Sequence, residues 1–173
     1  LQFFSQPALA ATVQPKAANK PGLSIFLERQ AVFPAFLSLL MGICIGGILS
    51  FITLRAKEAQ IDNVGYYFLT STLCVFFSRL ISGRVYDRKG HYWVILPGAL
   101  LLCSGLLMLW RVSSLATLLY AAVLYGAGIG ALFPAMQAWM ISLVEPDRSS
   151  IANAVFYNSL DIGVGGGAII LGI

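Results

Sequence analysis

The sequence has little charge, a single histidine and no clustered cysteines, and these shortages exclude several classes of protein. Only 10% of its 173 residues are Asp, Glu, Lys or Arg, whereas soluble domains carry about 25%. Cys44, Cys74 and Cys103 form no CxxC pair, and no histidine lies near them. We therefore expect no metal, redox pair or other cofactor. Soluble enzymes and nucleic-acid-binding proteins are excluded as well.

Long apolar runs account for the missing charge. Each run exceeds the roughly 18 residues that a helix needs to cross the hydrocarbon core. The second run contains only Arg79 and Arg84, both near its end, and the fifth contains only Asp161. The sequence predicts an all-α integral membrane protein with about five transmembrane helices. We expect these spans at residues 32–54, 64–86, 93–110, 114–144 and 149–173.

The basic residues gather on one side of the expected membrane. Residues 1–31 are polar, contain three prolines and have the composition of a linker. Alternate loops share the linker's side, and eight of the 11 basic residues belong to that group. Because cytoplasmic loops carry the excess of Lys and Arg, we expect the linker, the second loop and the fourth loop to be cytoplasmic. The eight are Lys16, Lys20, Arg29, Arg79, Arg84, Arg88, Lys89 and Arg148, and the other three are Arg55, Lys57 and Arg111.

Glycine pairs recur at GxxxG spacing within the apolar runs. Small residues at this spacing let helix backbones approach closely in lipid. They predict close helix packing or, alternatively, positions where helices slide during a conformational cycle. The pairs are Gly42 with Gly46, Gly126 with Gly130, and Gly163 with Gly167.

The loop expected between the second and third spans carries the most specific motif. Gly83, Asp87, Arg88 and Gly90 match the pattern GxxxD(R/K)xG, and this loop resembles the signature loop of the major facilitator superfamily. The next two residues, His91 and Tyr92, depart from it, because the family usually has Arg or Lys there. We expect a two-glycine turn that reverses the chain at the membrane surface.

Asp87 has two possible roles in this motif. It can pair locally with Arg84 or Arg88, which contributes little at a solvated surface. It can also face the positive N-terminal end of a neighbouring helix. The resemblance implies the second role, a cytoplasmic latch and gate between two halves of a transporter.

The order of features resembles the second half of a twelve-span facilitator, from the central loop to span eleven. The chain begins without Met and ends inside an apolar run, so we interpret it as an internal fragment. The resemblance implies a cytoplasmic linker between halves at 1–31 and a partial C-terminal bundle at 32–173. The missing N-terminal half would complete a substrate cavity near the membrane midplane.

Asp161 is the most informative polar residue inside a span. It lies about 18 Å along the fifth helix at 1.5 Å per residue, near the midplane. A carboxylate there is costly unless it faces protein or water, and low dielectric favours its protonated form. Asn153 and Tyr157 share its helical face, and Asn158 is close by. The stripe is either a coupling or substrate site, or a structural cluster.

Three further polar residues have open roles. Arg79, about one and a half turns from the expected cytoplasmic end of its helix, either extends to the surface or pairs with a carboxylate in the bundle. Gln137 on the fourth span is a weaker cavity candidate. We expect His91 to be exposed in its loop, with a pH sensor as the alternative.

The resemblance implies a multi-pass transporter of the cell membrane that moves a small molecule by alternating access. The apolar spans and the single membrane carboxylate resemble those of the superfamily's exporters of drugs or metabolites, and this resemblance implies proton-coupled efflux by an antiporter. One alternative is uptake of a specific sugar, organic anion or siderophore. Another is a sensor or assembly protein that transports nothing. An enzyme is not expected, because no GxSxG motif and no cluster of metal ligands is present.

Overall fold

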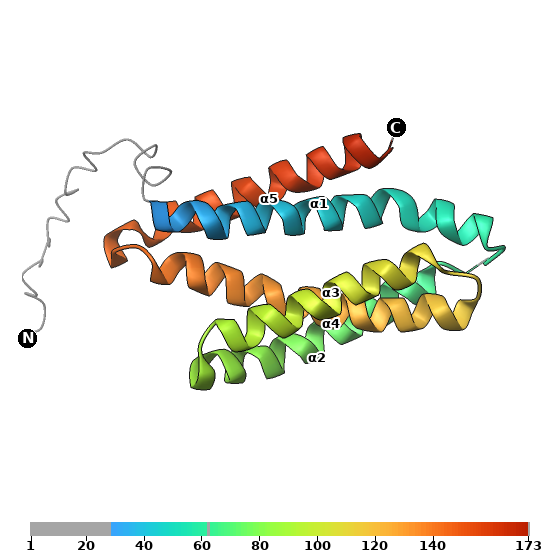
Figure 1. Ribbon diagram of the computed structural model, residues 1–173, viewed down its shortest axis with the longest axis horizontal. Coiled ribbons are helices and arrows are strands. Elements are labelled where there is room, and N and C mark those ends of the chain that lie inside the picture. The colour runs from blue at the N-terminus through green and yellow to red at the C-terminus, as the bar shows by residue number, and fades with distance from the viewer. Residues whose placement is uncertain (1–28, 62, 173) are drawn as a thin grey trace, which may run out of the picture.

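The computed structural model describes residues 29–61 and 63–172, which are almost entirely helical (Figure 1). The all-α fold class is confirmed for this part of the chain. Residues 1–28 of the expected linker lie outside the described residues, and residues 29–31 form the first turn of a helix. The elements are α1 (Arg29–Glu58), α2 (Gly65–Lys89), α3 (Tyr92–Trp110), α4 (Leu115–Ser142), the short 3-10 turn η2 (Pro146–Arg148) and α5 (Ser149–Gly172).

Helices α1 to α4 are each long and apolar enough to cross a membrane. Helix α5 has 24 residues, which is long enough to cross a membrane. Its polar side chains, among them Asn153, Asn158 and Asp161, lower its hydropathy. Such a helix can cross a membrane only where protein or water shields its polar side.

Successive helices run in alternating directions, as expected of a bundle whose loops alternate between two surfaces. The start of α1, the α2–α3 turn and the α4–α5 turn lie at one end (Figure 1). We call it the basic end, because Arg84, Arg88, Lys89 and Arg148 lie there.

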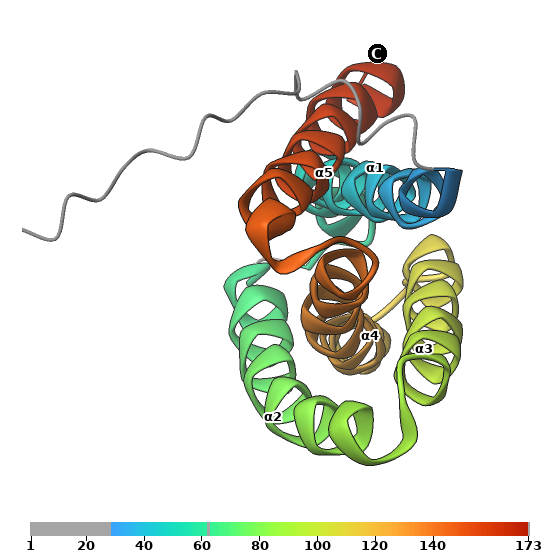
Figure 2. The same cartoon turned by 90° about the vertical axis from the view of Figure 1, so that its left-hand side faces the viewer.

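The helices form two groups, the pair α1 and α5 and the trio α2, α3 and α4 (Figure 2). Within the pair, the expected GxxxG residues bring the two backbones into contact. A Cβ added at Gly42 or Gly46 would collide with a carbonyl oxygen of α5, and one at Gly163 or Gly167 would collide with a carbonyl oxygen of α1. These glycines therefore provide the close helix packing that the motifs predicted.

Within the trio, α4 lies between the other two helices (Figure 2). Gly126 and Gly130 lie against the backbone of α2, whereas Gly128 lies against the backbone of α3 near Leu102. Helices α2 and α3 therefore pack on opposite sides of α4 and contact each other little.

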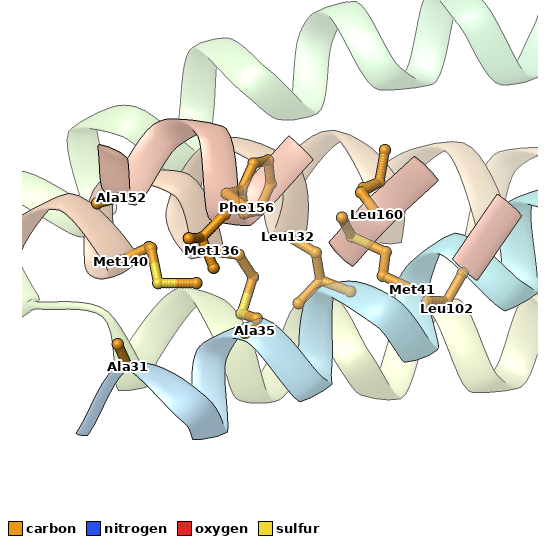
Figure 3. Packing of buried hydrophobic residues seen from close by; sticks show 11 residues of the cluster. Ala31, Ala35, Met41, Leu102, Leu132, Met136, Met140, Ala152, Phe156 and Leu160 are labelled. Atoms are coloured by element: carbon orange, nitrogen blue, oxygen red, sulfur yellow. The ribbon is translucent and has the colours of Figure 1, made fainter. Parts of the chain in front are cut away.

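A hydrophobic core joins the pair to the trio. Met41 of α1, Met136 and Met140 of α4, and Phe156 and Leu160 of α5 belong to one buried cluster (Figure 3). A polar contact joins the groups at the opposite end of the bundle. There Arg55 of α1 pairs with Glu58 at 2.7 Å and donates a hydrogen bond to the carbonyl oxygen of Trp110, at the end of α3.

Candidate functional site

A hydrogen-bonded polar cluster lies where α4 meets α5. The Gln137 amide nitrogen donates to the Asn153 side-chain oxygen at 2.7 Å and lies 3.5 Å from the Tyr157 hydroxyl. Gln137 is about 8 Å from the end of α4, and Tyr157 is about 12 Å from the start of α5, at 1.5 Å per residue. The structure thus brings together three residues that the sequence singled out on two separate helices.

Aromatic rings extend this cluster toward α2. The Phe133 ring of α4 lies 5.4 Å from Phe156 and 6.1 Å from Tyr157 of α5, between ring centroids. The guanidinium carbon of Arg79 lies 5.6 Å from the centre of the Phe133 ring, a cation–π distance. Arg79 is exposed and makes no ion pair with another described residue, so the alternative of a carboxylate partner is not seen within the described chain. Phe133 was missed because a phenylalanine in an apolar run carries no functional signal of its own.

Asp161 and Asn158 continue the same side of α5 beyond Tyr157. Both are exposed, and neither makes a hydrogen bond or ion pair with the described part of the chain. Asp161 lies about 18 Å from the start of α5, one helical turn beyond Tyr157. We call the set the polar stripe, and it consists of Arg79, Gln137, Asn153, Tyr157, Asn158 and Asp161.

The polar stripe offers a definite set of interactions. It provides amide and phenol groups that donate and accept hydrogen bonds, ring faces, one carboxyl and one guanidinium. Hydrocarbon would penalise the exposed Asp161 and Asn158 by several kcal/mol, so these side chains fit a water-filled space or a protein partner. No group of three metal-ligating side chains occurs among the described residues.

The expected two-glycine turn is wrong, because α2 continues through Gly83 to Lys89. A Cβ at Gly83 would meet nothing within 4 Å, so this glycine is not required by packing. A glycine inside an exposed helix costs only about 1 kcal/mol, which does not stop α2. Gly90 alone makes the turn, with φ of 86° and its N–H bonded to the Tyr86 carbonyl at 2.9 Å.

The motif residues Arg84, Asp87 and Arg88 therefore lie on the last turns of α2, where all three are exposed. Asp87 forms no ion pair with either arginine in the described structure. It borders a cavity of about 150 Å³ between α2 and α4, whose other wall includes Pro134 and Ala138. The carboxylate remains available to a group outside the described chain.

His91 is not the exposed loop residue that we expected. It lies directly before α3, is half-buried, and stacks on Trp139 of α4 with ring centroids 4.8 Å apart and planes 13° apart. Its Nε2 is enclosed and has no hydrogen-bond partner within the described residues. The tight turn at Gly90 brings the start of α3 against α4, which encloses the ring.

Comparisons with known proteins agree on one family. Residues 5–173 match the sequence model of the family described as the Major Facilitator Superfamily. An uncharacterized MFS-type transporter of Burkholderia mallei (strain SAVP1) is 28% identical over 135 residues, which are 78% of this chain and 33% of the relative. A protein named as a probable sugar efflux transporter, from Mannheimia succiniciproducens, is 31% identical over 117 residues, 64% of this chain and 29% of the relative.

The chain spans about a third of the length of the curated relatives that it matches. No solved structure gives a significant match. The similarity therefore concerns about a third of each of these relatives.

Proposed function

Because the chain belongs to the Major Facilitator Superfamily, we propose that it is the C-terminal part of a secondary active transporter that exports a small molecule in exchange for protons. In this proposal the chain crosses the cell membrane with its basic end in the cytoplasm. A second half packs against it, and the substrate binds between the halves near the midplane. The first 31 residues link the two halves.

One observation carries the proposal: a partly exposed polar stripe lies on helices that are otherwise apolar. Its residues extend from about 6 Å to about 18 Å along α5, from the basic end toward the midplane. Polar side chains at this depth are expensive unless they face an aqueous path. The stripe is therefore the wall that this half contributes to the transport cavity.

The chemistry of the stripe favours a neutral substrate that forms hydrogen bonds. Gln137 and Asn158 present amides, and the rings of Phe133 and Tyr157 can stack on a flat or ring-shaped molecule. Asp161 and Arg79 contribute opposite charges, which leaves the stripe without net charge. The relative named as a sugar efflux transporter supports export and a polar substrate. Uptake of a sugar, organic anion or siderophore is the alternative.

Asp161 is the proposed proton carrier. It is an exposed carboxyl at membrane depth, and it has no partner among the described residues that would fix its charge. Such a carboxyl can exchange protons with the water on whichever side of the membrane the cavity opens to. Exchange of protons against substrate requires a group of this kind.

The experiment uses the full-length gene in cells that lack their native exporters. Efflux of radiolabelled sugars, which test the neutral polar substrate, and of a cationic fluorescent dye, which tests a drug substrate, is measured with and without a protonophore. We expect efflux that the protonophore abolishes, that Asp161→Asn loses and that Asp161→Glu retains at least in part. Efflux that survives in a well-expressed Asp161→Asn variant would assign the carboxyl a structural role. Uptake in place of efflux would favour the alternative.

A further inference from the structure

A second feature, separate from the polar stripe, is an apolar groove between α2 and α3. It has a volume of about 380 Å³, within the range of small-molecule sites. Phe77, Ile81 and Val85 form its α2 wall, Pro97 and Leu101 belong to its α3 wall, and α4 forms its floor. No residue of the polar stripe lines it. We call this feature the α2–α3 groove.

Three consecutive residues of α4 place its backbone at the floor of the groove. Gly126 lies against α2 and Gly128 against α3, which leaves Ala127 between the two helices and in the groove. Both serine hydroxyls of the lining are satisfied, because Ser78 donates to the Ala127 carbonyl at 2.7 Å and Ser82 donates to the Arg79 carbonyl at 3.2 Å. The interior of the groove is therefore apolar and has no unmet hydrogen bond to offer a polar ligand.

The length of the groove matches one leaflet of a bilayer. Its lining runs from Cys74 to Val85 along α2 and from Trp93 to Leu101 along α3. At 1.5 Å per residue these segments span about 16 Å and 12 Å, and half of the hydrocarbon core is about 15 Å. An extended acyl chain of one leaflet would occupy the groove from the interface to the midplane.

The end of the groove at the α2–α3 turn is cationic. The Lys89 ammonium lies 5.2 Å from the centre of the Trp93 ring, and Trp93 lines the groove. Arg84 and Arg88 precede Lys89 on the last turns of α2, with Asp87 as the one carboxylate among them. None of these residues forms an ion pair within the described structure. The apolar groove thus opens beside a net positive charge at the expected membrane interface.

We propose that the α2–α3 groove binds an anionic phospholipid, with one acyl chain between α2 and α3 and the phosphate at Lys89. The ammonium neutralises the headgroup and the Trp93 indole N–H donates to it, as interfacial tryptophans commonly do. The occupant is a membrane lipid and not a transported substrate, because the groove and the polar stripe share no residue. Positive charge beside the groove selects anionic over zwitterionic lipids.

The test measures lipid bound to the purified full-length transporter in detergent by native mass spectrometry. The protein is incubated with equal amounts of phosphatidylglycerol and phosphatidylcholine. Two variants remove the two parts of the site: Lys89→Gln removes the headgroup charge, and Ala127→Leu fills the groove from its floor. The matched controls are Lys57→Gln, an exposed lysine at the other end of the bundle, and Ala116→Leu, an exposed alanine at the other end of α4.

We expect preferential retention of phosphatidylglycerol, which Lys89→Gln lowers about fivefold, the factor for one cation at a membrane surface. Lys89→Arg should keep the preference for phosphatidylglycerol, because it keeps the positive charge. Ala127→Leu should reduce the binding of both lipids. Neither control should change retention. Equal retention of the two lipids, or loss in the controls as large as in the test variants, would overturn the proposal. Retention that Ala127→Leu leaves unchanged would show that another part of the full protein fills the groove, and would also overturn it.

Discussion

At the scale of single residues, the Gln137 amide links the two helix groups by a side-chain hydrogen bond within the described structure. It donates to Asn153 at 2.7 Å across the boundary between α4 and α5. Such bonds inside membranes contribute about 0.6 kcal/mol on average. The contact is therefore weak enough to break and reform as helices move, and it also positions both amides on the polar stripe.

We predict that the effects of Gln137→Ala and Asn153→Ala on stability are not additive. A double-mutant cycle should give a coupling free energy of about 0.6 kcal/mol, because either single change removes the same hydrogen bond. Unfolding of the full-length protein in detergent measures the coupling. The pair Gln137→Ala and Tyr120→Ala is the control, since Tyr120 is exposed at the other end of α4 and its effect should add. Additivity in the first pair would contradict the contact.

Asp87 leads to a second prediction. If its carboxylate latches onto a helix of the other half, Asp87→Asn should slow transport while expression and folding persist. The expected loss is about fivefold or less, because a helix terminus stabilises a nearby charge by about 0.3–1 kcal/mol at exposed sites. Initial transport rates at matched expression measure it. Asp147→Asn, an exposed carboxylate of η2 at the same end, is the control. Equal rates for wild type and Asp87→Asn would remove the latch.

The sequence predicted part of this site. Asn153 and Tyr157 could be grouped with Asp161 because helical periodicity places residues four apart on one face. The contacts of Gln137 and of Arg79 could not be predicted in the same way, because they depend on how α2, α4 and α5 pack together. Phe133 gave no signal, since an aromatic residue in an apolar span is ordinarily part of the lipid surface or the core. The transport roles of all these residues stay predictions.

At the scale of helices, backbone contact between α1 and α5 depends on particular glycines. A Cβ at Gly42 would overlap a carbonyl oxygen of α5, whereas a Cβ at Gly165 would meet nothing within 4 Å. Backbone atoms cannot turn aside as side chains can, so the first substitution must push the helices apart. Glycine is therefore required for helix packing at position 42 but not at position 165.

Gly42→Ala should therefore destabilise the protein by about 1–3 kcal/mol, the usual cost of overpacking. Gly165→Ala should be neutral or slightly stabilising, because alanine favours the helical state by up to about 1 kcal/mol. Thermal unfolding of the two full-length variants in one detergent compares them directly. A similar change of stability in both variants would contradict the backbone contact at Gly42, because only that contact distinguishes the two positions.

The apolar runs predicted where the helices lie, but they did not predict where α2 ends. The motif suggested a turn from Gly83 to Gly90, yet only Gly90 has the positive φ that ends the helix. Sequence alone could not distinguish the two glycines, because Gly83 is compatible with both a helix and a turn. The motif residues consequently project from a rigid helix end. This holds Asp87 in a fixed place beside the cavity between α2 and α4.

At the scale of the whole molecule, two kinds of exposed surface imply two different surroundings. The exposed residues of α3 include Leu96, Leu100 and Leu107, which suit lipid. The exposed side of α5 carries Asn158 and Asp161, which suit water. If the proposed function is correct, these surfaces face the bilayer and the transport cavity respectively in the complete transporter.

Cysteine labelling distinguishes these surroundings in the full-length protein in membranes. With Cys44, Cys74 and Cys103 replaced by serine, and any cysteines elsewhere removed, a single cysteine is introduced at position 158 or 100. We expect a charged methanethiosulfonate reagent to modify Asn158→Cys and to leave Leu100→Cys unmodified, because thiolates form and react in water and not in hydrocarbon. Substrate should slow the reaction at position 158 by occupying the cavity. No labelling at position 158 would mean that the stripe does not face a water-filled path. Labelling at position 100 alone would reverse the assignment of the two surfaces.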